Sequence, residues 1–111
     1  MSDYPTPLAY LTAEVAKVNE RAAAFAGITW TMGYDFTADG QGQWHYKIVD
    51  GVAQPVQEGE DAAATVTVHG KFTTFFDCMT GKSSIAVAFM TGKLKSKGDN
   101  KVGQRFAKLM S

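Results

Sequence analysis

The sequence predicts an α+β fold, in which helices cover one face of an antiparallel-rich sheet. Three changes of pattern lead to this prediction. Apolar residues recur at steps of three and four from Leu8 to Phe25, alternate with polar residues from Ile28 to Ile48, and return to steps of three and four from Phe72 onward. The first and last patterns are typical of helices and the middle one of strands. Consecutive strands with helices grouped around them favour α+β over a regular alternation of strand and helix.

The composition fits one domain over residues 1–111. Of its 111 residues, 45% are hydrophobic and 20% are charged, so folding can bury about 65% of the surface of the unfolded chain around a single core. Lysine and arginine together number 11, as do aspartate and glutamate, which gives a formal net charge of zero. Because nothing in this balance attracts a polyanion, we expect no nucleic acid partner.

The number of cysteines and the sequences at the two chain ends indicate the cellular compartment in which we expect the protein. The single cysteine, Cys78, excludes an intramolecular disulfide and multi-cysteine zinc sites. No apolar run approaches the roughly 18 residues of a membrane span. The start, Met1-Ser2-Asp3-Tyr4-Pro5, lacks the order of a signal peptide, and the end, Leu109-Met110-Ser111, is not a peroxisomal Ser-Lys-Leu address. We therefore expect a soluble, cytoplasmic protein.

The first element is a long helix. Thr6 followed by Pro7 is a good N-cap and first-turn pair, and Gly27 is placed to end the helix. The apolar stripe between them consists of Leu8, Leu11, Val15, Val18, Ala22 and Phe25.

Strands follow from Ile28. The alternating segments 28–36 and 44–48 are joined by the turn Asp39-Gly40-Gln41-Gly42 and predict a hairpin. Asp50-Gly51 marks a second turn, and Pro55 confines a short strand over 52–56 to a sheet edge. After an acidic loop at 58–61, alternation over 64–69 predicts a further strand.

The last third predicts two short helices, a strand and a closing helix. The first helix starts at Phe72 and is ended by Gly81; the second is capped by Ser83 or Ser84 and stopped by Gly92. Residues 93–97 alternate as a strand. Asp99 can then cap a final helix, whose apolar face comprises Val102, Phe106, Leu109 and Met110.

Three lysines, Lys93, Lys95 and Lys97, are expected on one face of the last strand. They can form a basic surface for anionic headgroups, with transient contact to a membrane surface, or they can simply protect an edge strand from aggregation. We favour edge protection, because the sequence shows no neighbouring apolar segment suited to insertion.

Candidate catalytic and metal-binding residues are few. His45, His69 and Asp35 all fall on the polar sides of their strands, but their spacing specifies no ligand set. Cys78 has no histidine close in sequence to activate it as a nucleophile. We therefore expect no metal, no cofactor and no catalytic residue.

The C-terminal half resembles the sterol carrier protein type-2 family. The resemblance rests on the strand Ala63 to Gly70, the aromatic helix Phe72 to Thr80, the Gly81-Lys82-Ser83 break and the segment Ala88 to Asp99, whose "AFMTGKLKSKGD" is similar to the family's "AFMSGKLKIKGD". The first half agrees in element order and in its Asp39-Gly40-Gln41-Gly42-Gln43-Trp44 turn.

The resemblance implies a five-stranded sheet with an apolar tunnel between sheet and helices, which holds a fatty acyl chain, a sterol or a similar lipid. The lining residues that it implies are Phe72, Phe75, Phe76, Met79, Ile85, Phe89, Met90, Val102, Phe106 and Leu109. Ser96, Asn100, Lys101 and Gln104 stand where the family usually has apolar residues.

These observations favour non-catalytic binding and carriage of a lipid. The alternative is a structural or interaction module of the same fold whose tunnel is collapsed. A third reading, from another class, is a small enzyme that uses His45 or His69 beside an apolar pocket. Ligand identity and oligomeric state stay open at this stage.

Overall fold

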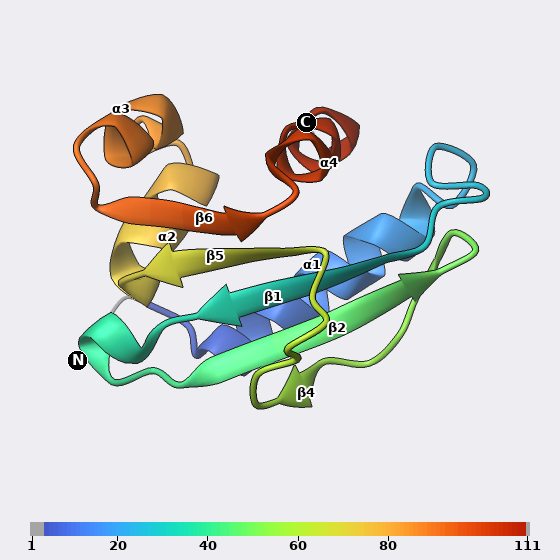
Figure 1. Ribbon diagram of the computed structural model, residues 1–111, viewed down its shortest axis with the longest axis horizontal. Helices are drawn as coiled ribbons and strands as arrows, with labels where there is room; N and C mark the ends of the chain where they lie inside the picture. The colour runs from blue at the N-terminus through green and yellow to red at the C-terminus, as the bar shows by residue number, and fades with distance from the viewer. Residues whose placement is uncertain (1–3, 111) are drawn as a thin grey trace.

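The computed structural model describes residues 4–110 and consists there of one sheet with helices around it (Figure 1). Met1-Ser2-Asp3 and Ser111, which entered the expectations about the chain ends, lie outside the described residues. The helices are α1 (Pro7–Glu20), the 3-10 helix η1 (Thr37–Asp39), α2 (Phe72–Met79), α3 (Ile85–Met90) and α4 (Asn100–Met110). The strands are β1 (Trp30–Asp35), β2 (Gln43–Val49), β3 (Val52–Ala53), β4 (Gln57–Glu58), β5 (Val66–Gly70) and β6 (Leu94–Gly98).

The sheet confirms the α+β prediction and is mixed. Its strand order is β3-β2-β1-β5-β6, and β4 pairs with β2 beside β3. β1 and β5 run parallel, whereas the other pairs are antiparallel. The described strands number six rather than five, because two short strands lie on either side of Pro55 in place of one strand over 52–56. Proline lacks the amide hydrogen that a continuous ladder needs.

The alternation in the sequence sets which side chains face the helices. β1 and β2 pair with Trp30 opposite Ile48 and Tyr34 opposite Trp44, and the buried Met32 and Tyr34 lie on the helix side. The alternate residues, such as Gly33 and Asp35, lie on the opposite, outer face. A one-residue slip would exchange the two faces, so the apolar pattern fixes this register.

Helix α1 begins where predicted and ends earlier than predicted. The amide of Ala9 donates to Oγ1 of Thr6 at 3.1 Å, which confirms the N-cap. The prediction of one helix up to Gly27 is wrong: α1 ends at Glu20, and residues 21–27 form turns with bonds between residues three apart. These tighter turns place Phe25 in the core, where it is fully buried. Leu8, at the start of the predicted stripe, is 47% exposed.

A buried carboxylate joins α1 to the sheet. Glu14 lies on the buried side of α1, and its Oε2 accepts hydrogen bonds from the hydroxyls of Tyr34 and Tyr46, both at 2.6 Å. Burial raises the pKa of Glu14, and the two tyrosine hydrogen bonds oppose this only in part. Burial also raises the pKa of both tyrosines, and the nearby Glu14 adds to the effect.

Aromatic side chains fill the space between α2 and the sheet. Phe72 and Phe75 are buried and pack on Phe36, with ring centroids 5.1 and 5.4 Å away. Asp39, at the end of η1, accepts a hydrogen bond from the amide of Phe72 at 3.0 Å and so caps α2 from a distant part of the chain. The predicted helix over 72–79 is confirmed.

Helix α4 closes the fold at the end of β6. Gly98 has φ +105°, and a Cβ there would lie 2.5 Å from the carbonyl oxygen of Thr65, so only glycine fits this corner. Oδ1 of Asp99 accepts from the amides of Lys101 and Val102, as predicted for an N-cap. The corner therefore turns α4 back over β5.

We predict that Glu14→Gln changes how stability depends on pH. The folded state holds the Glu14 proton more tightly than the unfolded chain does, because burial raises its pKa above the usual 4.5. The stability that this proton contributes is fully present below the pKa that Glu14 has in the unfolded chain. It is lost as the pH rises through the pKa of Glu14 in the folded protein. The wild type should therefore lose stability relative to Glu14→Gln as pH is raised from about 4.5, when unfolding is followed in urea.

The matched control is Glu20→Gln, which removes an exposed carboxylate from the same helix. If the Glu14→Gln and Glu20→Gln curves ran parallel to the wild type at every pH, the buried carboxyl would not titrate with folding.

We also predict that Phe72→Ala lowers the free energy of unfolding by about 3–5 kcal/mol, because it removes a buried ring and leaves a void. Met90→Ala should change it by less than about 0.5 kcal/mol, since Met90 is 84% exposed. Urea midpoints of the two variants measure the difference. Similar losses in both would show that Phe72 does not fill the core.

Candidate functional site

The ten apolar residues expected to line a lipid site lie on α2, α3 and α4, and the structure separates them by burial. Phe72 and Phe75 belong to the filled core. Phe76 is half-buried, with its ring centroid 5.6 Å from that of Tyr4 and 5.7 Å from that of Tyr10. The rings of Tyr4, before α1, and Tyr10, in α1, thus cover one edge of α2.

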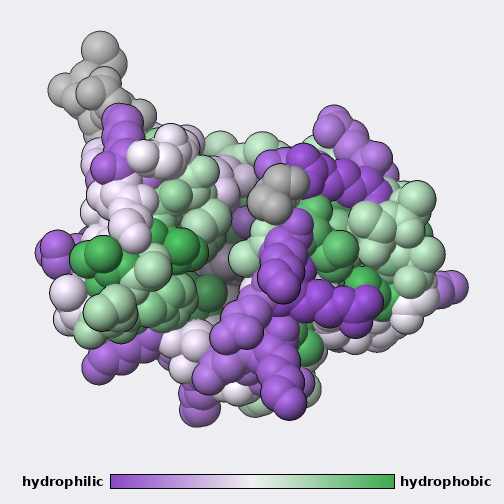
Figure 2. Space-filling view, turned by 90° about the horizontal axis from the view of Figure 1, so that it is seen from above, coloured by the Kyte–Doolittle hydropathy of each residue, from purple (hydrophilic) through white to green (hydrophobic). Residues whose placement is uncertain are grey.

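Helix α3 carries the most exposed members of the set. Ile85, Phe89 and Met90 are exposed, as is Met79 at the end of α2. Val87, which the analysis of the sequence missed, is 54% exposed, and within α3 only Ala88 is buried. The absence of any polar residue in the segment from Ile85 to Met90 is the signal that could have identified Val87. Figure 2 shows hydrophobic side chains gathered over this helix.

Helix α4 presents the last three members, Val102, Phe106 and Leu109, which are half-buried against the core. Phe106 packs on Phe25 with ring centroids 6.0 Å apart. Two arginines hold the helix in place: Arg21 Nη1 donates to the carbonyl of Leu109 at 2.9 Å, and Arg105 lies 5.7 Å from the centre of the Trp30 ring. The predicted apolar face of the closing helix is confirmed.

Between these helices, the middle of β5 and β6 is the least covered part of the helix side of the sheet. Val68 pairs with Ser96 there; Val68 is half-buried and Ser96 is exposed. The Ser96 hydroxyl donates to Oδ1 of Asn100 at 2.6 Å, so polar groups line one margin. Seen from above in Figure 2, the surface dips between α3 and α4. The apolar side chains of α3 and α4 therefore border a shallow depression.

The outer face of the sheet holds the histidines. Nδ1 of His69 lies 3.3 Å from Oδ2 of Asp35, and Nδ1 of His45 donates to the carbonyl of Gly59 at 2.8 Å. The sheet separates both histidines from the apolar faces of α1 and α2. Within residues 4–110, no three His, Cys, Asp or Glu side chains are arranged to hold a metal ion.

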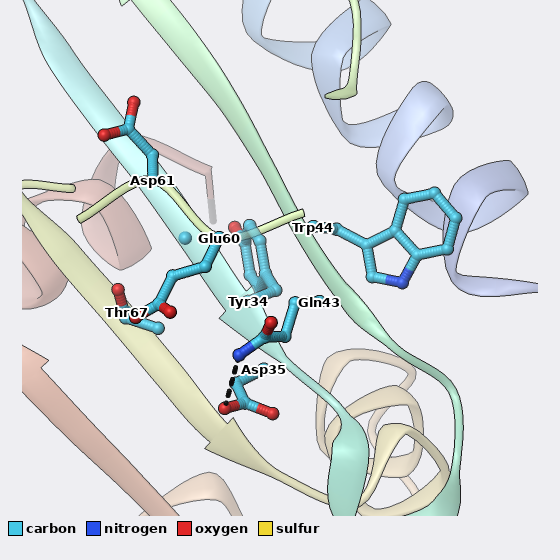
Figure 3. A pocket seen from close by; sticks show the side chains of 8 residues that line it. Tyr34, Asp35, Gln43, Trp44, Glu60, Asp61 and Thr67 are labelled. Carbon is cyan, nitrogen blue, oxygen red and sulfur yellow. Dashed lines mark hydrogen bonds between the residues drawn. The ribbon is translucent and has the colours of Figure 1, made fainter. Parts of the chain in front are cut away.

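A small polar hollow lies on the same outer face, between the sheet and the loop before β5 (Figure 3). Its volume is about 10 Å³, which is the space of about one water molecule. Asp35, Gln43, Glu60, Asp61 and Thr67 are among its lining residues, and Gln43 donates to Asp35 at 3.3 Å. A lipid chain does not fit there.

A larger open groove, of about 490 Å³, lies where β5 ends and β6 begins. His69, Lys71, Lys93 and Lys95 line it together with Gly92 and small side chains. Lys95 pairs with His69 and Lys97 with Thr67 on the outer face, whereas Lys93 precedes β6. The three predicted lysines thus do not form a single strand face, and two of them line a basic groove directly after α3.

Cys78 sits on α2 in surroundings that disfavour a thiolate. Partial burial raises the pKa of its thiol, the neighbouring Asp77 raises it further, and Lys93 opposes both effects. A thiol nucleophile needs the opposite shift.

None of the helices formed by residues 4–110 is both long and apolar enough to cross a membrane. The basic groove and helix α3 both lie on the surface of the molecule.

Solved structures with the same fold fall into two kinds. An inverting sec-alkylsulfatase from Pseudomonas sp. is 24% identical with a TM-score of 0.65; the match covers 78% of this chain and only 14% of that enzyme. The sterol carrier protein 2 like 2 from Aedes aegypti is 17% identical with a TM-score of 0.61, covering 89% of this chain and 96% of that one. The solution structure of its palmitated form matches this chain with 19% identity and a TM-score of 0.61. That match covers 86% of this chain and 89% of the other.

Comparison with curated protein sequences finds no match. The sequence itself matches the SCP-2 sterol transfer family over residues 11–111, which is nearly the whole chain. The predicted resemblance is thereby confirmed, and the chain belongs to the SCP-2 sterol transfer family.

Proposed function

We propose that this protein binds and carries an apolar lipid, such as a fatty acyl chain or a sterol, without reacting with it. Membership of the SCP-2 sterol transfer family carries this proposal. The family relation supports lipid binding or transfer in general terms, and the palmitated relative binds a chain of this kind. The helices of this chain supply the apolar side chains that such a ligand needs.

The proposed binding place is the depression between α3 and α4 above Val68 and Ser96. Phe89 from α3 and Val102 and Phe106 from α4 are exposed or half-buried in the unliganded state, so they can gain burial when a ligand covers them. Phe72 and Phe75 would form the floor of the site from within the core. Met79, Ile85, Met90, Phe76 and Leu109 complete the proposed set.

Binding in this place requires a small separation of the helices. Neither of the two pockets described above lies between α3 and α4, so we infer that an acyl chain opens its space there as it binds. The contacts that hold α4 include a hydrogen bond from Arg21, ring contacts of Phe106 and Arg105, and the packing of Val102 and Leu109 on the core, and these would have to re-form around a ligand.

The alternative proposal is a structural or interaction module with a collapsed tunnel. The filled packing of Phe72 and Phe75 against Phe36 favours it, as does the occurrence of this fold as a minor part of a sec-alkylsulfatase. In that case the protein would carry no lipid, and the depression would be covered by another protein surface.

We expect saturable binding of a fluorescent long-chain fatty acid with micromolar-type affinity and no hydrolysis of acyl esters. Burying about ten methylenes supplies roughly 8 kcal/mol before association costs are subtracted. Native mass spectrometry of gently purified protein should also show a bound lipid mass. An apo mass together with no saturable titration would reject lipid carriage in favour of the interaction module. Changing both His45 and His69 should leave fatty-acid binding intact, because both lie on the outer face of the sheet.

We predict that Phe76→Ala affects ligand affinity more than stability. Its ring is half-buried in the unliganded protein, so its loss should destabilise less than the loss of Phe72. Fatty-acid affinity should fall by about tenfold, the equivalent of two methylenes at about 0.8 kcal/mol each. Urea midpoints and fatty-acid titrations of Phe76→Ala give both quantities. Val52→Ala, at an exposed site on β3, is the control; a large stability loss with unchanged affinity in Phe76→Ala would remove this residue from the site.

A further inference from the structure

The exposed apolar side chains of α3 are not explained by lipid binding in the depression alone. A surface helix normally turns polar residues to water, yet all six residues from Ile85 to Met90 are apolar and only Ala88 is buried. Val87 and Met90, at 54% and 84% exposed, project away from the core. Contiguous exposure of this kind usually marks a surface that another phase or molecule covers.

Positive charge borders the same helix. Lys82 precedes α3, Lys93 follows it, and Lys71 and Lys95 line the basic groove with Lys93; all four side chains are exposed. The groove begins at Gly92, two residues after the helix ends. The apolar α3 and the basic groove are thus neighbours at the end of the sheet where β6 begins, in a molecule whose net charge is zero.

The carboxylates nearest to this side accept hydrogen bonds from the protein. Asp77 accepts from the hydroxyl of Tyr4 at 3.0 Å, Asp39 accepts from the amide of Phe72, and Asp35 lies 3.3 Å from His69. They are held toward these partners, whereas the lysines extend into solvent. The three carboxylates keep their charge, but the four lysines outnumber them, so the balance of charge around α3 and the groove is positive and favours an anionic partner.

We propose that α3 and the basic groove form a docking surface for an anionic lipid bilayer, with Val87 and Met90 in the boundary between headgroups and acyl chains and the lysines on the phosphates. The proposal deepens the proposed function, on which it rests, because a lipid carrier must reach the bilayer that holds its cargo. It takes up the alternative to edge protection that the sequence left open, with α3 as the apolar segment beside the lysines.

The size of α3 favours a bilayer over a second protein surface. Six helical residues span about 9 Å, which suits a shallow position in the interface and is far too short to cross a membrane. Its large exposed side chains are Ile85, Val87, Phe89 and Met90, whereas each partner in a standard protein interface contributes about 20–30 residues. A fluid bilayer adapts to the shape of the helix, so it needs no large surface that is complementary to α3.

The test is co-sedimentation with vesicles of phosphatidylcholine alone and of an equimolar mixture with phosphatidylserine, at low and high salt. The wild type should bind the mixed vesicles more tightly, and salt should weaken the binding. Val87→Glu and Met90→Glu should each reduce the partition coefficient by about tenfold through lost apolar burial. Lys93→Glu with Lys95→Glu should reduce it by about 25-fold or more and abolish the preference for phosphatidylserine.

Matched controls come from the same chain. Val52→Glu replaces a valine that is 53% exposed on β3, and Lys47→Glu reverses an exposed lysine on β2; both should bind vesicles like the wild type. Equal losses in Val52→Glu and Val87→Glu, or no binding of the wild type to mixed vesicles, would overturn the proposal. Sedimentation velocity measures the oligomeric state of the wild type and of Val87→Glu. If the wild type were a dimer and Val87→Glu a monomer, a second copy of the chain would cover α3, and the docking proposal would be overturned.

Fatty-acid titration without vesicles, carried out on the wild type and on Val87→Glu, separates the two proposals, because Val87 lies outside the proposed lipid-binding set. In the wild type, retained fatty-acid binding with no vesicle binding refutes docking and leaves carriage supported; in Val87→Glu, the same pattern is the result that docking through α3 predicts. Retained vesicle binding with no fatty-acid binding refutes carriage alone and leaves docking supported.

Discussion

Burial of one face of the sheet is the constraint on which the rest of this structure depends. The helix side of β1 and β2 carries large apolar residues such as Met32, Tyr46 and Ile48, which are all buried. Helix α1 covers this half, α2 closes the end near Gly70, and α4 lies over β5 at the other end. Between α2 and α4, the short α3 packs against α2 and β6 and leaves Val68 and Ser96 incompletely covered. The depression thus follows from how the covering helices are distributed.

The buried carboxyl of Glu14 shows how polar groups are accommodated in such a core. Two tyrosine hydroxyls, from neighbouring strands, donate to one oxygen of this carboxyl, and no buried side-chain nitrogen or oxygen within residues 4–110 lacks a hydrogen-bond partner. A satisfied polar cluster of this kind specifies how α1 sits on the sheet, because any other position would leave these groups without partners. Tyr34 is the neighbour of Val68 across β1 and β5, but the cluster is buried and both hydroxyls donate to Glu14, so we assign it to positioning α1 rather than to ligand contact.

The two proposals concern neighbouring parts of the molecule: the depression lies on the helix side of the sheet, and the basic groove lies where β5 ends and β6 begins, with His69 and Lys95 contributed from the outer face. The depression between α3 and α4 would hold a lipid, and the outward side of α3 with the basic groove would meet the bilayer. Because α3 borders both, a lipid leaving the bilayer would meet α3 before it reaches Phe106 on α4. This geometry gives a physical reason for an entirely apolar helix at the surface: its inner and outer sides both face hydrocarbon during transfer.

The local sequence by itself determined the type and order of the main elements, the side of the sheet that is buried, the caps at Thr6 and Asp99, and the family, and it narrowed the cap of α3 to Ser83 or Ser84, of which the structure uses Ser84. These properties depend on spacing along the chain and on short-range hydrogen bonds, which a sequence displays directly. Only the tertiary structure decided that Glu14 is buried, that the first helix ends at Glu20 because turns carry Phe25 into the core, and that Phe72 fills space whereas Met90 does not. These differences depend on which distant segments, such as β2, α4 or η1, lie against a given residue, and the same apolar stripe is compatible with either outcome.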